Sequence, residues 1–450
     1  MGLANSIDKQ PEFIVPTTRS RGLKPTKKVV VVVHGVASCA LETKLANPRD
    51  LGWSFACRDQ HDWDLAWISI EDVVTRGQQM LNSLHLRVVE RKLKDGTKVN
   101  STANLKGCQV RPIAGLDGVN QLNPGECVPI RVFAALTEVL SESFNVLAFS
   151  YDWRRWGDPV FNEGYLGRFQ RGMQSAFLSS GQPISIIAHS MGTLVVLWCL
   201  SKLGAAWTEK HVSEVIAVGP CLMGAPVACG AYGHIPAQAN IGIYMPEIVE
   251  HVVADATSTW AGTVSCFPSS IGTGTSKVDP FGDHALVVTP TRNYTSSDMG
   301  AFLKDLGEHV PGRDVGMKLW SGVEKMKEEI AAQPIDIHAI YSSGFHTTNQ
   351  LKWESDDLKN RPSQSRWEKG DKLVTSASVE TWAEQWNKKT EARVHLHEVP
   401  GAVNHKDLIM CQYSLDLIPK LCRSSATTVH SLPNLLRRTP TPTRENYYKK

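Results

Sequence analysis

The chain has 450 residues, of which 42% are hydrophobic and 21% charged, and its formal net charge is +3. These values are typical of a soluble globular protein with a sizeable core, and the charge is too small to indicate nucleic acid as a partner. Polar residues interrupt every apolar stretch before it reaches the roughly 18 positions that a membrane-spanning helix needs, so no transmembrane helix is expected.

The N-terminal residues 1–26 are polar and contain several prolines, which predicts a flexible lead. No basic segment followed by an apolar one is present, so we expect no secretory signal and a cytoplasmic location. The first six residues, MGLANS, fit the pattern for myristoylation of Gly2, which would attach the protein peripherally to membranes. The ten cysteines form no C-x-x-C pair, which disfavours a structural zinc site and fits free thiols in a reducing compartment.

Buried strands of a parallel sheet are predicted where β-branched residues form short apolar runs, beginning with the five valines of Val29–Val33. Helix-like stretches over 130–140 and 193–203 separate some of these runs. Alternating strands and helices indicate a mostly parallel central sheet flanked by helices, an α/β fold. The other predicted strands are Val146–Phe149, Ile184–Ala188, Val215–Val218, Ile335–Tyr341 and Val394–Val399.

Two segments break this alternation and are interpreted as insertions that form a cap and a lid. The first spans about 68–128 and contains a predicted hairpin around Asp95-Gly96; the second spans about 224–330 and is rich in small residues. Both belong to one domain over 27–422. The tail over 423–450 is basic and rich in Pro, Thr and Ser, which predicts disorder.

A candidate nucleophile lies where the apolar run Ile184–Ala188 meets a second apolar stretch, in Ala188-His189-Ser190-Met191-Gly192. A strand, a serine flanked at two positions by small residues, and a helix are the pattern of the nucleophile elbow of α/β-hydrolases. The turn presents the serine at the sheet edge above a helix N-terminus, which favours an oxyanion. The alternative is an ordinary turn serine between two core elements.

A serine nucleophile needs a base and an acid, which in this fold follow it in the order acid, then histidine. Asp371 follows a glycine, and His405 lies on the loop after the last predicted strand. Each alone could be structural, Asp371 as a turn aspartate and His405 as a helix-capping residue. His284 and His346 are weaker competitors.

An oxyanion hole requires two N–H donors, one from the residue after the nucleophile and one from the loop after an early strand. Met191 and Val36 occupy these positions. A simple strand-ending turn at Gly35 is the alternative for the second. Such chemistry needs no cofactor and no metal.

Several blocks, in order, resemble the lecithin:cholesterol acyltransferase family, over about residues 28–415. The early loop reads HGVASCALETKL from His34, and Ala188–Gly192 resembles the family's elbow. The remaining blocks are Leu86–Gly125, Tyr151–Arg154, Gly224–Pro226, Phe267–Ser269, Gly370–Val374 and Asn404-His405.

The resemblance implies the α/β-hydrolase fold, Ser190 as acyl nucleophile, Asp371 and His405 as its relay, and Val36 and Met191 as oxyanion donors. It also implies a phospholipid substrate at a membrane or lipid surface, with the acyl group passed to water, as in a phospholipase A, or to an alcohol such as a sterol or diacylglycerol. Two departures stand out: Val227 replaces a tryptophan, and the family's loop disulfide has only Cys39 and Cys57 as candidates.

Two other functions fit the same residues. One is a serine hydrolase of neutral lipids or small esters, and the other is a catalytically silent hydrolase fold that acts as a binding protein. The sequence does not indicate an oligomeric state.

Overall fold

The computed structural model describes residues 13, 27–45, 63–67, 83–125, 129–233, 255–272, 277–309, 314–388 and 393–424. Gly2, the rest of the predicted N-terminal lead apart from Phe13, and residues 425–450 of the predicted tail lie outside these ranges, as does Cys57. The ring of Phe13 stacks on Phe149 with 4.0 Å between centroids, so this point of the lead contacts the core.

The centre of the molecule is a six-stranded sheet in the order β15-β12-β9-β8-β1-β7, and every neighbouring pair runs parallel. All the predicted strands are present in it, so the mostly parallel central sheet is confirmed. The bounds are β1 Val29–Val33, β7 Asn145–Ala148, β8 Ile184–His189, β9 Val212–Val218, β12 Asp336–Tyr341 and β15 Val394–Glu398.

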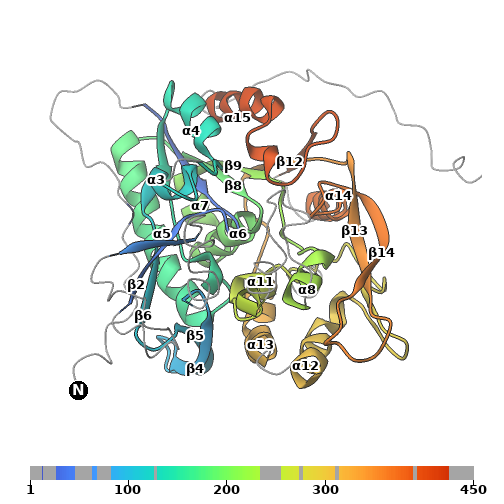
Figure 1. The fold of residues 1–450 in the computed structure, drawn as a ribbon. Coiled ribbons are helices and arrows are strands. Elements are labelled where there is room, and N and C mark those ends of the chain that lie inside the picture. The colour runs from blue at the N-terminus through green and yellow to red at the C-terminus, as the bar shows by residue number, and fades with distance from the viewer. Residues whose placement is uncertain are drawn as a thin grey trace, which may run out of the picture.

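Helices flank this sheet (Figure 1). Because helices cover both faces of a parallel sheet, its strands are apolar throughout. Every residue of β1 and of β8 is buried. Helices α5 and α6 contact β1 and β8, α3 and α4 contact β7, and α14 contacts β12 and β15. The bounds are α3 Gly115–Asn120, α4 Ala134–Ser141, α5 Pro159–Ser180, α6 Met191–Leu203, α7 Ala205–His211, α14 Ser376–Asn387 and α15 Gln412–Ser424.

The first predicted insertion, over about 68–128, contains the predicted hairpin. β4 (Leu86–Lys92) and β5 (Lys98–Asn104) pair antiparallel around a turn in which Gly96 has a φ of 89°, the left-handed conformation that glycine adopts without strain. A separate three-stranded sheet has the order β3-β2-β6. Its strands are β2 Leu41–Leu45, β3 Asp64–Trp67 and β6 Cys108–Pro112.

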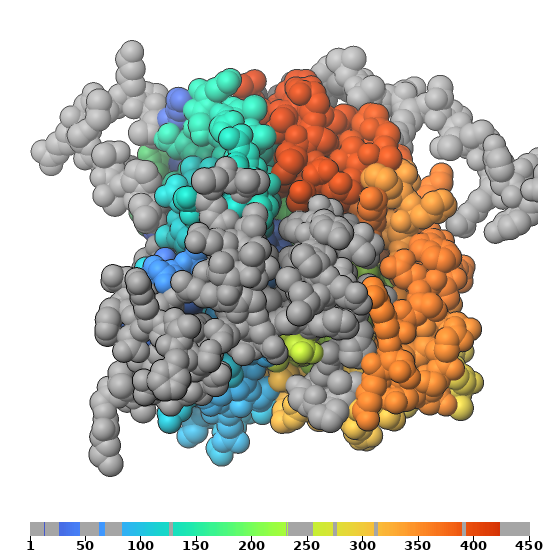
Figure 2. Space-filling model, in the orientation of Figure 1, coloured from blue at the N-terminus to red at the C-terminus, as the bar shows by residue number. Residues whose placement is uncertain are grey.

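The second predicted insertion, over 224–330, contains helices and two strands of a small sheet beside the core (Figures 1 and 2). This sheet, in the order β11-β10-β13-β14, extends past residue 330, and the long β13–β14 hairpin forms the right flank of the face in Figure 2. The bounds are α8 Pro226–Gly233, α11 Ala261–Ser265, β10 Val287–Val288, β11 Asn293–Tyr294, α12 Met299–His309, α13 Asp314–Glu328, β13 Phe345–Lys352 and β14 Ser363–Gly370. Short 3₁₀ turns occur at η2 Trp153–Arg155, η4 Ser296–Asp298 and η5 Asp407–Ile409.

The buried carboxylate of Asp158 joins the hairpin to the main domain. It caps α5 by accepting the N–H of Val160 at 2.9 Å, and it accepts hydrogen bonds from the hydroxyls of Ser101 and Thr102 at 2.9 and 2.6 Å. Arg155 lies 3.5 Å away as its ionic partner, with 3% of its side chain exposed. Removing the carboxylate takes the acceptor from these buried donors and an ionic partner from the guanidinium, which still donates to Thr102.

We therefore expect Asp158→Ala to lower the free energy of unfolding by about 3–5 kcal/mol, the usual cost of breaking a buried charged network. Urea denaturation followed by circular dichroism measures the shift. The control is Glu384→Ala, which removes an exposed pair with Lys388 and should leave the midpoint unchanged. Equal midpoints for the two variants would contradict the structural role of Asp158.

Candidate active site

Ser190 lies in a sharp turn between β8 and α6, as predicted from the elbow pattern. Its φ and ψ are 56° and −128°, a conformation that residues other than glycine rarely adopt. Gly192 makes the turn possible, since a Cβ there would lie 2.5 Å from the carbonyl oxygen of Val33. A Cβ on Gly35 would lie 2.7 Å from the Cβ of Ser190. The loop after β1 therefore abuts the serine directly.

Asp371 and His405 form a buried hydrogen-bonded pair. Nδ1 of His405 lies 2.8 Å from Oδ2 of Asp371, and the side chains are only 4% and 3% exposed. The other carboxylate oxygen accepts the backbone N–H groups of Leu373 at 2.9 Å and Val374 at 2.7 Å. The carboxylate is thus fixed as an acceptor, which holds the imidazole proton on Nδ1 and leaves Nε2 with its lone pair. The backbone N–H of His405 also donates to the carbonyl of Asp371 at 2.8 Å.

The Nε2 atom of His405 is buried and has no hydrogen-bond partner within the described residues. Buried polar atoms are nearly always hydrogen-bonded, and a catalytic role is one explanation for an exception. In the described part of the chain, Nδ1 of His189 and Nε2 of His284 are also buried without a partner, but Nε2 of His405 is the one opposite a carboxylate that fixes the ring.

The turn after β9 links Ser190 to His405. Val218 accepts the N–H of Ser190 at 2.9 Å, and the N–H of Cys221 donates to the carbonyl of Ser190 at 3.3 Å. Between them, Gly219 has a φ of 53°, and a Cβ on it would lie 3.0 Å from Cε1 of His405. The same turn therefore fixes the serine backbone and supports one side of the imidazole ring.

His189 contacts the backbone of His405, because its Nε2 lies 3.1 Å from the carbonyl oxygen of His405. Burial lowers the pKa of His189 to about 3, so the ring is neutral and Nε2–H donates to that carbonyl. The competing histidines lie elsewhere: His284 pairs with Arg366, and His346 is exposed on β13.

The two candidate oxyanion donors flank Ser190. Met191 is the first residue of α6, where backbone N–H groups have no partner within the helix. Val36 follows Gly35, which abuts Ser190. The carbonyl groups of the loop around Val36 are all engaged: Gly35 O lies 2.9 Å from His34 Nδ1, Val36 O accepts from Ser38 Oγ at 3.0 Å, and Ala37 O accepts from Trp67 Nε1 at 3.0 Å.

A buried tryptophan cluster connects this loop to the second insertion. The rings of Trp67, Trp153 and Trp260 lie with centroids 4.8 to 5.9 Å apart, and all three are buried. The indole N–H of Trp153 donates to the carbonyl of Cys39 at 3.0 Å. Cys39 is a buried free thiol and forms no disulfide with another described cysteine; Cys57 lies outside the described residues.

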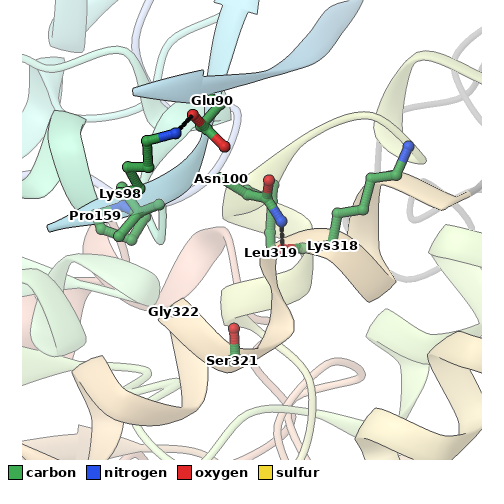
Figure 3. A pocket seen from close by; sticks show the side chains of 9 residues that line it. Glu90, Lys98, Asn100, Pro159, Lys318, Leu319, Ser321 and Gly322 are labelled. Carbon is green, nitrogen blue, oxygen red and sulfur yellow. Dashed lines mark hydrogen bonds and ion pairs between the residues drawn. The ribbon is translucent and has the colours of Figure 1, made fainter. Parts of the chain in front are cut away.

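A shallow depression elsewhere on the surface contains none of these groups. It lies between the β4–β5 hairpin and α13, and it is closed on one side by the ion pair of Lys98 with Glu90 (Figure 3). Asn100 spans it by donating to the carbonyl of Lys318 at 3.0 Å. Within the described residues, no three His, Cys, Asp or Glu side chains are grouped so as to hold a metal ion.

Comparison with known proteins identifies the family of the chain. The family model described as "Lecithin:cholesterol acyltransferase" matches residues 76–319, more than half of the chain. The chain belongs to the lecithin:cholesterol acyltransferase family. The resemblance inferred from the sequence blocks is thereby confirmed, as is the α/β-hydrolase fold.

Curated relatives in the lecithin:cholesterol acyltransferase family include two kinds of enzyme. A phosphatidylcholine-sterol acyltransferase of Papio anubis is 23% identical over 419 residues, 89% of this chain and 86% of that protein. A lysosomal phospholipase A and acyltransferase of Rattus norvegicus is 25% identical over 257 residues, 56% of each chain. Among solved structures, the Tle4–Tli4 complex gives a TM-score of 0.45 at 12% identity, covering 89% of this chain and 99% of that one.

In the described residues, no single helix is long and apolar enough to cross a membrane. Helices α6 and α7 together are long and apolar enough by length and composition, but the chain bends by 116° between them. The buried residues of α6 include Met191–Leu200, so this helix is part of the core around the elbow.

The contact between Gly35 and Ser190 predicts the effect of a single methyl group. In Gly35→Ala the new Cβ would meet the Cβ of Ser190 at 2.7 Å, so the loop or the serine must shift. We expect the rate at which a fluorophosphonate labels Ser190 to fall by about 10²-fold, since displacements near 1 Å have this cost. Gly164→Ala on α5, where a Cβ meets nothing within 4 Å, is the control and should label at the normal rate. Normal labelling of Gly35→Ala would contradict the close approach.

Proposed function

We propose that Ser190, Asp371 and His405 form a catalytic triad that transfers acyl groups through an acyl-enzyme on Ser190. The hydrogen bond of 2.8 Å between Asp371 and His405, with the opposite ring nitrogen buried and unpartnered, is the observation that carries the proposal. The strained φ of Ser190 supports it, because such strain is typical of a serine presented at a nucleophile elbow.

In the proposed mechanism Nε2 of His405 removes the hydroxyl proton of Ser190 as Oγ attacks an ester carbonyl. Asp371 keeps the imidazole in the correct tautomer and stabilises its positive charge. The N–H groups of Val36 and Met191 donate to the oxyanion, each contributing about 3 kcal/mol to the lowering of the barrier. The protonated His405 then passes its proton to the departing alcohol, leaving the acyl group on Ser190. Water or another alcohol, deprotonated by His405, releases it.

We infer a glycerophospholipid as acyl donor, taken from a membrane or lipid surface. Membership of the family supports this substrate class, as do the names of relatives that act as phosphatidylcholine-sterol acyltransferase or phospholipase A. The acceptor distinguishes the two activities within the proposal: water makes the enzyme a phospholipase A, and a sterol or diacylglycerol makes it an O-acyltransferase.

Ser190→Ala should abolish acyl release from phospholipid vesicles while the chain remains folded, because no other group in the mechanism carries the acyl intermediate. The measurement is radiolabelled fatty acid release, with circular dichroism to check folding and mass spectrometry to find the acyl adduct on the wild-type serine. Turnover by Ser190→Ala near the wild-type level would overturn the assignment of the nucleophile.

Asp371→Asn should lower kcat by roughly 10³–10⁴-fold and leave KM nearly unchanged, because the amide favours the wrong imidazole tautomer without emptying the site. Steady-state kinetics on the same vesicles measures this effect. Asp298→Asn, at a capping box on the second insertion, is the matched control and should retain the wild-type kcat. A normal kcat for Asp371→Asn would show that the pair with His405 is only structural.

A product profile separates the acceptors and the rival functions. Labelled phospholipid is supplied alone, with sterol, or with diacylglycerol, beside triacylglycerol and short esters. A free fatty acid as sole product identifies a phospholipase, and a new ester identifies an acyltransferase. Turnover of triacylglycerol or short esters without phospholipid turnover would favour the neutral-lipid or small-ester hydrolase. A wild-type protein that turns over no substrate and does not label with a fluorophosphonate would favour the catalytically silent binding protein.

We further propose a cytoplasmic location with peripheral attachment to membranes through a myristoyl group on Gly2, supported by the sequence pattern alone. Metabolic labelling with an alkyne analogue of myristate should mark the wild-type protein. It should not mark Gly2→Ala, and an unlabelled wild type would remove this part of the proposal.

A further inference from the structure

We propose that the imidazole of His34 is a positioning residue that aims the backbone N–H of Val36 at the oxyanion. The inference rests on the proposed function, because it concerns how one of the two proposed donors acquires its direction. His34 itself is not a catalytic residue in this scheme. It acts through the peptide group that joins Gly35 to Val36.

The hydrogen bonds of His34 fix its tautomer. The ring is fully buried at the end of β1, and its Nε2 lies 3.2 Å from the backbone nitrogen of Tyr151. A backbone N–H can only donate, so Nε2 is the acceptor and carries no proton. In the neutral ring the proton is therefore on Nδ1, which lies 2.9 Å from the carbonyl oxygen of Gly35 and donates to it.

The surroundings keep this ring neutral and in place. Burial lowers the pKa of His34 to about 4, against the smaller raising effects of its bond to Gly35 and the charge of Asp152. The ring stacks on Tyr151 with 4.2 Å between centroids, and the phenol of Tyr151 donates to the carbonyl of His34 at 2.7 Å. Because both nitrogens and one face of the ring are engaged, the Nδ1–H bond points in a single direction.

That direction determines where the N–H of Val36 points. The carbonyl of Gly35 and the N–H of Val36 belong to one planar trans peptide, in which the two bonds point in opposite directions. Glycine places little restriction on rotation of this peptide, and Gly35 cannot be replaced by a bulkier residue where it abuts Ser190. The hydrogen bond from His34 supplies the restriction that the glycine lacks.

The other bonds to this loop do not perform the same task. Ser38 donates to the carbonyl of Val36 and Trp67 donates to that of Ala37, so they orient the two following peptides. Among the described hydrogen bonds, the one from His34 is made to the peptide that carries the Val36 N–H. We therefore expect loss of His34 to leave the loop in place but to change the direction of the Val36 N–H.

The test compares His34→Leu with His34→Asn in the full-length chain. Both variants leave the N–H of Tyr151 without its acceptor, so they share the same structural loss. Only the asparagine restores a donor at the place of Nδ1, because its amide nitrogen occupies an equivalent position on the side chain. The difference between the variants therefore isolates the bond to the carbonyl of Gly35.

His211→Leu is the matched control. His211 is also buried, places Nδ1 2.8 Å from a backbone carbonyl, that of Trp207, and stacks on an aromatic ring at 4.3 Å. It lies at the end of α7, outside the proposed site. Its loss has a comparable cost to packing and hydrogen bonding without touching the oxyanion loop.

Kinetics are measured on phospholipid vesicles and normalised to the fraction of enzyme that a fluorophosphonate titrates, with melting temperatures recorded in parallel. His34→Leu should lower kcat by about 10²-fold with KM within a factor of about two, because an oxyanion contact is made in the transition state and not in the bound ester. His34→Asn should recover at least about tenfold of that loss, and His211→Leu should keep the wild-type kcat at a similar melting temperature.

Two results would overturn the inference while leaving the proposed function intact. One is a normal kcat for His34→Leu, and the other is an equal loss in the leucine and asparagine variants, which would assign the effect to packing. The first of these includes a loss confined to KM, since kcat is then normal. Failure of the proposed function itself looks different, since the wild type would then not label at Ser190 or Ser190→Ala would remain active.

Discussion

The close approach of three backbone segments around Ser190 is the constraint on which the rest of the site depends. The loop after β1, the start of α6 and the turn after β9 meet there at distances that exclude a Cβ at Gly35, Gly192 and Gly219 without a local shift. Buried parallel strands bring these segments together, because their carboxyl ends lie at one edge of the sheet. The strained φ of Ser190 persists because these neighbours determine its position from several sides.

Around this constraint, several hydrogen bonds to backbone carbonyls order the site. Neutral imidazoles serve this purpose twice, at His34 and at His189, and burial keeps both of them uncharged. His189 donates to the carbonyl of His405. Thus the residue before the proposed nucleophile supports the backbone of the proposed base, and the residue after β1 supports the proposed oxyanion donor. The site is held by its backbone contacts as much as by its three side chains.

The sequence predicted the central sheet well and the small sheets poorly, for a physical reason. A strand covered on both faces must be apolar throughout, and runs such as Val29–Val33 have little alternative to being one. β13 and β14 are mostly polar, and β10 and β11 are two residues long, so the signal of an alternating or continuous apolar run is absent. The residues of 224–330 therefore predicted no strands.

The triad candidates were identifiable because their chain order and loop positions are specific, and the structure brings Asp371 and His405 into contact. The roles of Gly219 and His34 were not identifiable in this way. A glycine at a strand end and a histidine in an apolar loop have many ordinary explanations. Only the approach of Gly219 to the ring of His405 and the contact of His34 with Gly35 distinguish them. Such contacts depend on tertiary structure, which periodicity and spacing do not encode.

The order in which the ribosome makes these parts has a consequence for the nascent chain. β1, β8 and the Ser190 turn are synthesised early, whereas Asp371 and His405 arrive near the C-terminal end of the domain. β12 and β15, which complete one side of the sheet, arrive equally late. A partly synthesised chain thus carries Ser190 without the proposed base, which follows β15, the last strand of the sheet in chain order. Under the proposed mechanism, catalytic competence is therefore coupled to completion of the fold.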